Sequence, residues 1–425
     1  MKTIGIHVPA FLTMLVLSSF CLRNNTDSQQ DKENGGIKLP TGFSATVFAD
    51  KPGPGRHIAV RENGDVYMAL TTMKNGGGVV AFRDENKDGR ADQTKYFGKS
   101  VTTGLDIKGK YLYLSDALQV WRVPLTNDLG STAEPEIIAT GFLKQNQHQD
   151  KTFALDDKGN LYVNVGAPSN ACQEKDRTPG SKGQDPCPQL ERQAGIWKFS
   201  SEKPNQDQVK DGSLYASGIR NSVAIAWNNK ENKLYVVQHG RDQLYQFYPK
   251  LYTEQQGAEL PAEEFLQVNQ GDFFGWPYCY YDQFQKQKLL APEYGGDAKQ
   301  KGRCTDAKDP IMAFPGHLAP NDLLFYTGNM FPEKYRDGAF IAFHGSWNRA
   351  PLEQKGYLVA FIPFKNGLPS GEWEVFADGF AGISPIKNMN DIKYRPMGLA
   401  QGPDGALYIS DSEEGRIWKV VYDGK

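Results

Sequence analysis

The sequence predicts an all-β protein, a six-bladed β-propeller with long inserted loops. The main observation is a short pattern that occurs six times: a tight turn containing Gly or Asn, then an apolar strand rich in aromatic residues. Its copies occupy residues 62–70, 108–116, 156–166, 230–240, 336–345 and 404–411. Further strand-like runs follow these copies, and no convincing long amphipathic helix separates them. Radial repetition of strands is typical of propellers.

The spacing of the six copies is irregular, so some blades must carry long insertions. We expect these insertions at residues 167–194 and 250–310. A propeller of seven or eight blades with degenerate repeats is the main alternative. The chain of 425 residues is long for one ordinary domain, but closed β folds often exceed the usual domain length.

The composition excludes one class of partner. The formal net charge is -2, and acidic and basic residues are well mixed. A nucleic-acid-binding surface needs an excess of basic residues, so we expect no nucleic-acid partner. Hydrophobic residues make up 39% of the chain and aromatic residues 12%, which is ample for a large core.

The N-terminus has the pattern of an export signal at residues 1–20. Lys2 supplies a short positive region, and residues 11–17 form an apolar run that is too short to span a bilayer by itself. Cys21 follows this region, as in bacterial lipoprotein signals, where such a cysteine becomes the lipidated first residue. Plain secretion is the alternative.

These features predict the location and the domain organisation. We expect an exported protein, periplasmic or on the cell surface, attached to a membrane through a lipid on Cys21. Residues 21–37 are polar for most of their length and are expected to form a flexible tether. Residues 38–425 are expected to form the propeller.

Four further cysteines, Cys172, Cys187, Cys279 and Cys304, remain after Cys21. An even number of cysteines in an exported chain indicates disulfides. The sequence allows three pairings; the nearest-neighbour one, Cys172 with Cys187 and Cys279 with Cys304, closes two insertion loops. A metal site is the weaker alternative, because the sequence has no CxxC motif and no nearby His cluster.

Residues that border the repeated strands converge at one mouth, because propellers gather loops at one end of a central channel. His148 precedes the third copy of the pattern, in the polar run 145–150. Arginines recur just before or after blade strands, at Arg56, Arg220, Arg241, Arg349 and Arg395. One such arginine alone more often has a structural role, but their recurrence indicates an anionic ligand.

Two strand ends share the order His-Gly followed by polar and charged residues. In residues 238–242, the carbonyls of Gly240 and Arg241, with Asp242 nearby, could hold a hard cation such as Ca²⁺. In residues 342–351, Trp347 and a neighbouring arginine suit a flat anionic ligand.

Other catalytic and metal-binding motifs are missing from the sequence. It has no GxSxG, P-loop or HExxH motif, and no GxGxxG follows a predicted strand. Residues 83–92 resemble part of a calcium loop but lack the bidentate Glu, so we interpret them as a plain turn.

At the candidate mouth residues the sequence resembles the soluble PQQ-dependent sugar dehydrogenases, in their sorbosone dehydrogenase-like and pyranose dehydrogenase branch. The resemblance covers roughly residues 38–423. It is carried by His148 and by the motifs IRNSVAIAW (219–227), QHGRDQL (238–244), FFGWPYCYYD (273–282) and FHGSWNR (343–349). It implies a six-bladed propeller with pyrroloquinoline quinone (PQQ) over the channel and Ca²⁺ beneath it.

The resemblance also implies roles for single residues. His148 matches the catalytic base, and Arg220 and Asn221 match a pair that contacts the quinone. Gly240 and Arg241 match the positions whose carbonyls bind Ca²⁺. The other positions expected to bind the cofactor or lie beside the metal are Arg56, His239, Asp242, Trp347, Arg349 and Arg395.

Two positions depart from the glucose-oxidising relatives. Ala167 stands where an Asp orients the catalytic His, and Met397 replaces a second arginine near Arg395. Either another acid, with Asp150 as a candidate, orients His148, or the activity differs.

The function implied by the resemblance is an exported quinoprotein dehydrogenase. It would oxidise a sugar or sugar aldehyde by hydride transfer to PQQ and pass the electrons to an external acceptor such as a quinone, a cytochrome or a dye. Two alternatives remain: a propeller that only binds a ligand, and a Ca²⁺-dependent, lactonase-like hydrolase.

Overall fold

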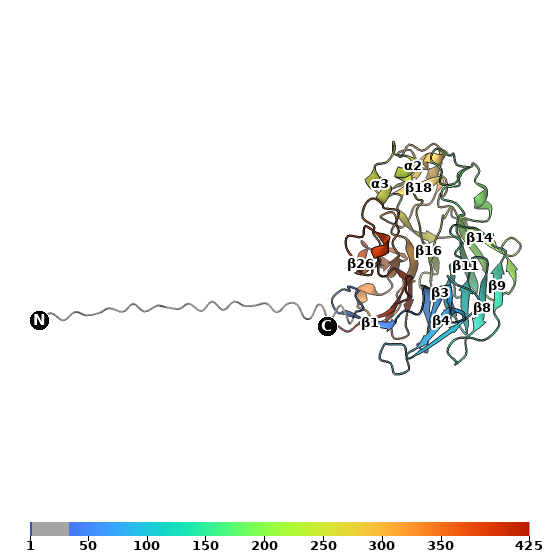
Figure 1. Ribbon diagram of the computed structural model, residues 1–425. Helices are drawn as coiled ribbons and strands as arrows, with labels where there is room; N and C mark the ends of the chain where they lie inside the picture. The colour runs from blue at the N-terminus through green and yellow to red at the C-terminus, as the bar shows by residue number, and fades with distance from the viewer. Residues whose placement is uncertain (2–33, 425) are drawn as a thin grey trace.

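The computed structural model describes Met1 and residues 34–424, so the expected export signal, Cys21 and most of the expected tether lie outside the described residues. The chain forms six main sheets arranged around an axis (Figure 1). The predicted six-bladed propeller is therefore confirmed. None of the described helices is long and apolar enough to cross a membrane.

Each blade is an antiparallel sheet of four main strands, of which the first named lies next to the channel and the last lies outermost. The first blade contains β2 (Gly55–Val60), β3 (Val66–Lys74), β4 (Gly77–Arg83) and β5 (Gln93–Phe97). The second contains β6 (Leu105–Lys108), β7 (Tyr111–Ser115), β8 (Val120–Pro124) and β9 (Glu136–Thr140), extended by the parallel strand β13 (Gln206–Asp207). The third contains β10 (Phe153–Leu155), β11 (Asn160–Val165), β12 (Gly195–Ser200) and β14 (Ser213–Ser217).

The remaining three blades repeat this order. The fourth contains β15 (Ala224–Asn228), β16 (Lys233–Gln238), β17 (Glu263–Val268) and β20 (Met312–Phe314). The fifth contains β21 (Pro320–Phe325), β22 (Ala339–Phe343), β23 (Leu358–Ile362) and β26 (Glu374–Ala377). The sixth contains β27 (Pro396–Gln401), β28 (Leu407–Asp411), β29 (Ile417–Tyr422) and β1 (Phe43–Ala49).

The first and last strands of the propeller pair with each other. β1 pairs antiparallel with β29, from Phe43 opposite Tyr422 onward. The N-terminal strand thus completes the last blade and closes the ring. Asn34 and Ile37, which the sequence placed in the tether, are buried, and the Asn34 side chain accepts a hydrogen bond from the Ala45 N–H (2.9 Å).

The six copies of the repeated pattern occupy equivalent places in the six blades. Each copy covers the turn after the innermost strand and then the second strand of its blade: β3, β7, β11, β16, β22 and β28. These second strands are almost completely buried within the six copies, and only β3 extends beyond its copy, with residues 71–73 exposed. A strand packed on both faces reads as a continuous apolar and aromatic run, which explains why this strand carried the clearest signal.

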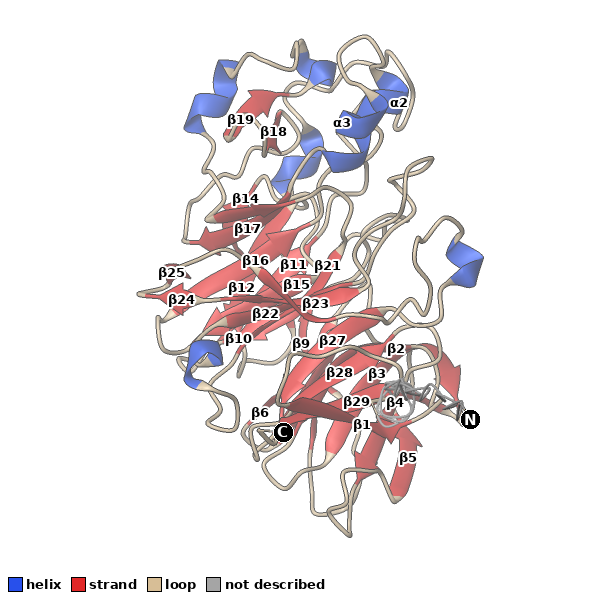
Figure 2. Cartoon of the chain, turned by 90° about the vertical axis from the view of Figure 1, so that its left-hand side faces the viewer, coloured by secondary structure: helices blue, strands red, loops and turns tan. Residues whose placement is uncertain are grey.

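The insertions stand at one end of the propeller (Figures 1 and 2). They contain the hairpin of β18 (Cys279–Asp282) and β19 (Gln287–Leu290) and the helices α2 (Leu244–Phe247), α3 (Glu254–Glu259), η1 (Pro188–Glu191), η2 (Pro292–Tyr294) and η3 (Gly302–Asp306). The expected insertion 250–310 is wrong in one respect: β17 divides it into two insertions. A six-residue strand between two irregular segments offers little periodicity to detect.

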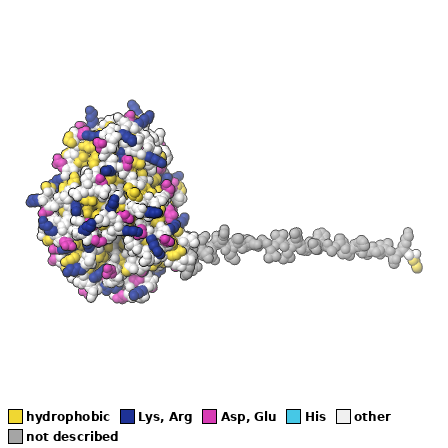
Figure 3. All heavy atoms as spheres, turned by 180° about the vertical axis from the view of Figure 1, so that it is seen from behind, with side chains coloured by type: hydrophobic (Ala, Val, Ile, Leu, Met, Phe, Trp, Pro, Cys, Tyr) yellow, Lys and Arg dark blue, Asp and Glu magenta, His cyan; other side chains and the backbone are white. Residues whose placement is uncertain are grey.

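Three small elements lie elsewhere: the hairpin of β24 (Phe364–Lys365) and β25 (Leu368–Pro369), and the helices η4 (Glu333–Tyr335) and η5 (Met389–Asp391). The main hydrophobic clusters fill the spaces between neighbouring blades. Acidic and basic side chains are interspersed over the face seen in Figure 3, as the nearly neutral net charge suggests.

Candidate active site at the mouth of the channel

The sequence-predicted site residues gather at the end of the propeller that carries the insertions. The innermost strands start at this end, and the second strands return to it. His148 therefore precedes β10, the pair Arg220 and Asn221 precedes β15, and Arg395 precedes β27. The segment 238–242 follows β16.

His148 is held in one orientation by the backbone. Its Nδ1 atom lies 2.6 Å from the carbonyl oxygen of Ala167. A carbonyl oxygen only accepts hydrogen bonds, so Nδ1 carries the hydrogen, and Nε2 is left as an acceptor with its lone pair free. The Gln145 side chain fixes the same loop by donating to the carbonyls of His148 (2.8 Å) and Gly166 (3.0 Å).

The strand before Ala167 approaches the histidine closely. A side-chain carbon at Gly166 would lie 2.6 Å from the His148 Cβ and 2.8 Å from the Asn221 Oδ1, so only glycine fits there. Asp150, the acid considered as an orienting partner, binds Arg56 and the Thr103 hydroxyl instead. The Ala167 carbonyl therefore takes the orienting role that we had considered for an acid.

The pKa of His148 is lowered to about 3, first by burial and then by the positive charge of Arg220. The imidazole is therefore neutral at physiological pH. A neutral imidazole with a free Nε2 can accept a proton from a substrate hydroxyl, which is what general-base catalysis requires.

Arg220 and Asp242 form the buried electrostatic centre of the site. The Arg220 Nη2 lies 2.9 Å from the Asp242 Oδ2, and its Nη1 donates to the Gly240 carbonyl (3.0 Å). Arg177 donates to the same Asp242 oxygen (2.8 Å), and the Asn348 amide donates to the other (2.7 Å). Burial alone would raise the pKa of Asp242, but the two guanidinium groups hold this pKa well below its usual range.

The expected metal ligands lie directly beside this pair. The Gly240 N–H donates to the buried Glu263 carboxyl group (2.8 Å), which fixes the turn. The Arg241 side chain turns into the insertion, where it forms a buried ion pair with Glu293 (2.5 Å), so only its backbone is placed to serve the mouth. Among residues 34–424, no group of three or more His, Cys, Asp or Glu side chains could hold a metal ion.

Three arginines that the sequence predicts as cofactor contacts, Arg56, Arg395 and Arg349, have different surroundings. Arg56 pairs with Asp150, and its buried Nε has no hydrogen-bond partner. Arg395 donates to the carbonyls of His344 (3.2 Å) and Gly345 and stays partly exposed. Arg349, by contrast, is 2% exposed, and backbone carbonyls and Glu259 occupy its guanidinium.

The other expected cofactor contacts also have defined environments. The His239 side chain donates from Nε2 to the Pro320 carbonyl (2.8 Å), and the backbone N–H of His239 donates to the Asn221 carbonyl (2.9 Å). Trp347 is 58% exposed, so its ring is available to a ligand. Met397 is fully buried, with the Asn321 amide nitrogen 3.1 Å from its sulfur.

Both disulfides have the nearest-neighbour pairing. Cys172 is bonded to Cys187, and Cys279 to Cys304. The four cysteines are buried in one cluster. They join segments of the insertions that stand over the mouth.

Sequence reasoning missed several polar residues that organise the site: Gln145, Asn170, Arg177, Glu263, His317 and Asn348. Asn170 and Arg177 lie in an insertion, where no strand pattern marks a position. Glu263 opens the strand that was not predicted. His317 was detectable only by its rarity, since the chain has six histidines.

Comparisons with known proteins identify the family of this chain. Residues 37–423 match the family model described as TrAA12-like. A protein of Borreliella burgdorferi is 24% identical over 91% of each chain. A Coprinopsis cinerea protein named pyrroloquinoline quinone-dependent pyranose dehydrogenase is 27% identical over 57% of this chain, but the match spans only 36% of that protein's length.

Two solved structures share the fold. The holo form of the pyranose dehydrogenase PQQ domain from Coprinopsis cinerea has a TM-score of 0.73 at 20% identity and covers 91% of this chain and 97% of its own. The calcium structure of the Trichoderma reesei enzyme of carbohydrate-active family AA12 has a TM-score of 0.74 at 19% identity, with the same coverage. These findings confirm the resemblance seen in the motifs, and because the family model matches nearly the whole described chain, the protein belongs to the TrAA12-like family.

Proposed function

We propose that the protein is an exported, PQQ-dependent dehydrogenase that oxidises a sugar or a sugar aldehyde. The observation that carries the proposal is the fixed, neutral His148 beside Arg220 at the channel mouth. The PQQ-dependent pyranose dehydrogenase among its relatives supports the cofactor and the substrate class. Two disulfides support export, because such bonds persist mainly in oxidising compartments.

The residues at the mouth fit PQQ, a flat molecule with three carboxylates and an ortho-quinone. The Arg56 Nε is buried without an acceptor, and Arg395 is partly exposed, so both can meet a carboxylate. The exposed ring of Trp347 offers a face for a planar ligand. Arg220, Asn221 and His239 are the groups we propose for the quinone side.

Ca²⁺ is the proposed second cofactor, and its ligands would be mainly backbone oxygens. No described donor bonds to the Arg241 carbonyl, whereas the Gly240 carbonyl is shared with Arg220. Asp242 adds negative charge beside them. Carbonyl and carboxylate oxygens are the ligands that Ca²⁺ prefers.

The chain's own residues would divide the work as follows. The Nε2 of His148 accepts the proton of the substrate hydroxyl, and the Ala167 carbonyl keeps that nitrogen directed at it. Arg220 supplies positive charge beside the reacting atoms, and Asp242 holds Arg220 in place. When bound, PQQ supplies the acceptor for the hydride that leaves the substrate carbon.

The substrate would be a small sugar, and the electrons would leave to an external acceptor. We also propose a lipid on Cys21 as the membrane attachment, because this cysteine ends an export-like signal.

The decisive experiment is a titration of purified, metal-stripped protein with PQQ, with and without Ca²⁺, following the quinone absorbance. A panel of aldoses and sorbosone is then added. We expect Ca²⁺-dependent binding at micromolar PQQ and bleaching of the quinone by at least one sugar. Failure of PQQ to bind would contradict the proposal.

A further inference from the structure

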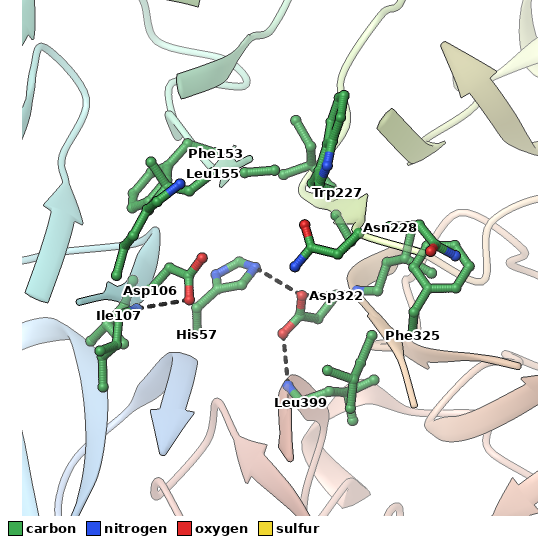
Figure 4. Close-up of a pocket in the computed structure, with 18 of the residues that line it drawn as sticks. His57, Asp106, Ile107, Phe153, Leu155, Trp227, Asn228, Asp322, Phe325 and Leu399 are labelled. Carbon is green, nitrogen blue, oxygen red and sulfur yellow. Dashed lines mark hydrogen bonds and ion pairs between the residues drawn. The ribbon is translucent and has the colours of Figure 1, made fainter. Parts of the chain in front are cut away.

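The far end of the channel holds a cavity of about 360 Å³ (Figure 4). The innermost strands of all six blades line it. Residues just past the ends of these strands, Asp157, Asn229 and Thr327, border it, so it lies at the end opposite the mouth. At about 30 Å³ per water molecule, it has room for a small organic molecule.

His57 presents an unpartnered acceptor to this cavity. Its Nδ1 lies 3.0 Å from the Thr103 carbonyl and therefore carries the hydrogen, which leaves Nε2 as an acceptor. Nε2 is buried and has no hydrogen-bond partner, and the side chain is only 9% exposed. The Asp322 Oδ1 lies 3.6 Å away, beyond hydrogen-bond distance.

Two carboxyl groups face the same space without a cation bound to either. Asp322 accepts the N–H groups of Leu323 (2.8 Å) and Leu399 (2.7 Å), and Asp106 accepts only that of Ile107 (2.7 Å). Burial raises the pKa of Asp322 to about 8 and that of Asp106 to about 6. In Figure 4 both groups lie beside the His57 ring.

Lys108 presents the opposite requirement from another wall of the cavity. Its Nζ is buried and has no acceptor among the described residues. A buried ammonium without an acceptor is unfavourable. Among the described residues, the His57 Nε2 therefore lacks a donor and the Lys108 Nζ lacks an acceptor.

We propose that this cavity is a second binding site, for a small zwitterion of amino-acid size that carries an ammonium group and a carboxylate. The ammonium group donates to the His57 Nε2 and to Asp322, and the carboxylate accepts from Lys108. Apolar side chains that line the cavity, including Leu155 and Trp227, contact the carbon chain. The site requires neither PQQ nor sugar, so it goes beyond the proposed function.

The test is calorimetric titration of the full chain without cofactors. The probes are glycine, 4-aminobutyrate and 6-aminohexanoate, which cover a range of charge separations; n-butylamine and butyrate are the matched single-charge analogues of 4-aminobutyrate, and n-hexylamine and hexanoate those of 6-aminohexanoate. We expect saturable binding of at least one zwitterion, at least tenfold tighter than its single-charge analogues. Lys108→Met should weaken that binding at least tenfold, because it removes the ammonium group that has no hydrogen-bond acceptor.

Asp128→Asn, at an exposed loop carboxylate outside the cavity, is the matched control and should leave binding unchanged. Asp322→Asn is the second variant. Its thermal unfolding is compared with that of wild type, because the Asp322 carboxyl group also accepts hydrogen bonds from two backbone N–H groups. A cavity that holds water only, shown by no saturable binding at millimolar probe, would overturn the proposal. Equal binding of the analogues, or full binding by Lys108→Met, would do the same. PQQ binding is measured separately, and its loss alone counts only against the proposed dehydrogenase.

Discussion

The Nδ1 atom of His148 donates to the Ala167 carbonyl across 2.6 Å. Residue 167 is thus important for its backbone, since its carbonyl oxygen selects the imidazole tautomer whatever the side chain is. This contact would orient His148, the proposed base, although residue 167 is an alanine and Asp150 binds Arg56 instead. It also shows why the strand β11 matters: it ends one residue before Gly166 and so carries this carbonyl to the histidine.

Replacing the base should abolish turnover without loss of the cofactor. We expect His148→Ala and His148→Gln to lower kcat about 10²- to 10⁴-fold, with PQQ affinity within a few-fold of wild type. The measurements are dye-coupled sugar oxidation and PQQ titration on the same preparations. Ala167→Ser is the matched control, because it keeps the carbonyl. Undiminished kcat in both histidine variants would remove His148 from the mechanism.

Arg395 and Arg349 should respond differently to substitution. Arg395 is partly exposed at the mouth, so Arg395→Met should weaken PQQ binding about tenfold or more, and it should destabilise the fold less than the loss of Arg349 does. Arg349 is buried and bound by protein atoms, so Arg349→Met should instead lower the free energy of unfolding by about 3 kcal/mol or more. The readouts are PQQ titration and urea unfolding. The reverse pattern would restore Arg349 as a cofactor contact.

Glu263 should position the turn at Gly240 that we propose for Ca²⁺, without contacting the substrate itself. It accepts the N–H groups of Gly240 (2.8 Å) and Ala319 (3.2 Å). Glu263→Ala should weaken Ca²⁺-dependent PQQ binding about 10- to 100-fold, as loss of supporting contacts does at metal sites. Glu263→Gln keeps one acceptor and should recover part of the affinity. If both variants bind PQQ like wild type, the turn does not depend on this contact.

The propeller and the centre of its mouth could be predicted because each rests on a local pattern. The second strand of each blade is largely buried and apolar, and His148, Arg220 and Asp242 lie in short loops within five residues of a strand end. The polar network could not be predicted in the same way. Arg177 lies in an insertion, 65 residues before Asp242 in the chain, and the two meet only in the folded protein. No periodicity in the sequence marks this contact.

The binding partners of the arginine side chains could likewise not be predicted from the sequence. Arg241 and Arg349 follow the same strand-His-Gly pattern, yet both side chains end in buried ion pairs with glutamates of the insertions, Glu293 and Glu259. Whether an arginine meets a ligand or a glutamate depends on partners distant in the chain. The nearest-neighbour disulfides were easier to anticipate, since each closes a short loop, with separations of 15 and 25 residues.

Loss of either disulfide should loosen the insertions over the mouth. Cys172→Ala with Cys187→Ala should lower the free energy of unfolding by about 2–4 kcal/mol. Cys172 lies just beyond Asn170, whose side chain accepts a hydrogen bond from Arg220. Because Arg220 is a proposed PQQ contact, PQQ affinity should fall as well. Urea unfolding with and without a reductant measures the first effect: the reductant should destabilise wild type more than the variant. Equal destabilisation of both proteins would contradict the prediction.

Stability should be greatest near pH 6.5, with opposite causes on the two sides. The pKa of His57 is lowered to about 4, first by burial and then by Arg56. Below pH 6.5 the unfolded chain binds a proton that the folded imidazole refuses, so stability falls as the pH drops from 6.5 toward 4, by about 3 kcal/mol for this residue alone. The buried His344, whose pKa is also lowered, acts in the same direction.

Above pH 6.5 the buried carboxyl groups with raised pKa values, Asp322 and Glu263, should lower the stability, and Asp322 can be tested by itself. Burial raises its pKa to about 8, so the folded protein keeps a proton there that the unfolded chain has already released. Stability therefore falls as the pH rises from about 4 to 8. Between pH 6.5 and 8, where His57 no longer opposes it, the loss due to Asp322 alone should be about 2 kcal/mol. Urea unfolding of wild type and Asp322→Asn at pH 6.5, 7.25 and 8 isolates this group, because the amide cannot titrate. Parallel pH profiles for the two proteins would show that Asp322 is already ionised in the fold.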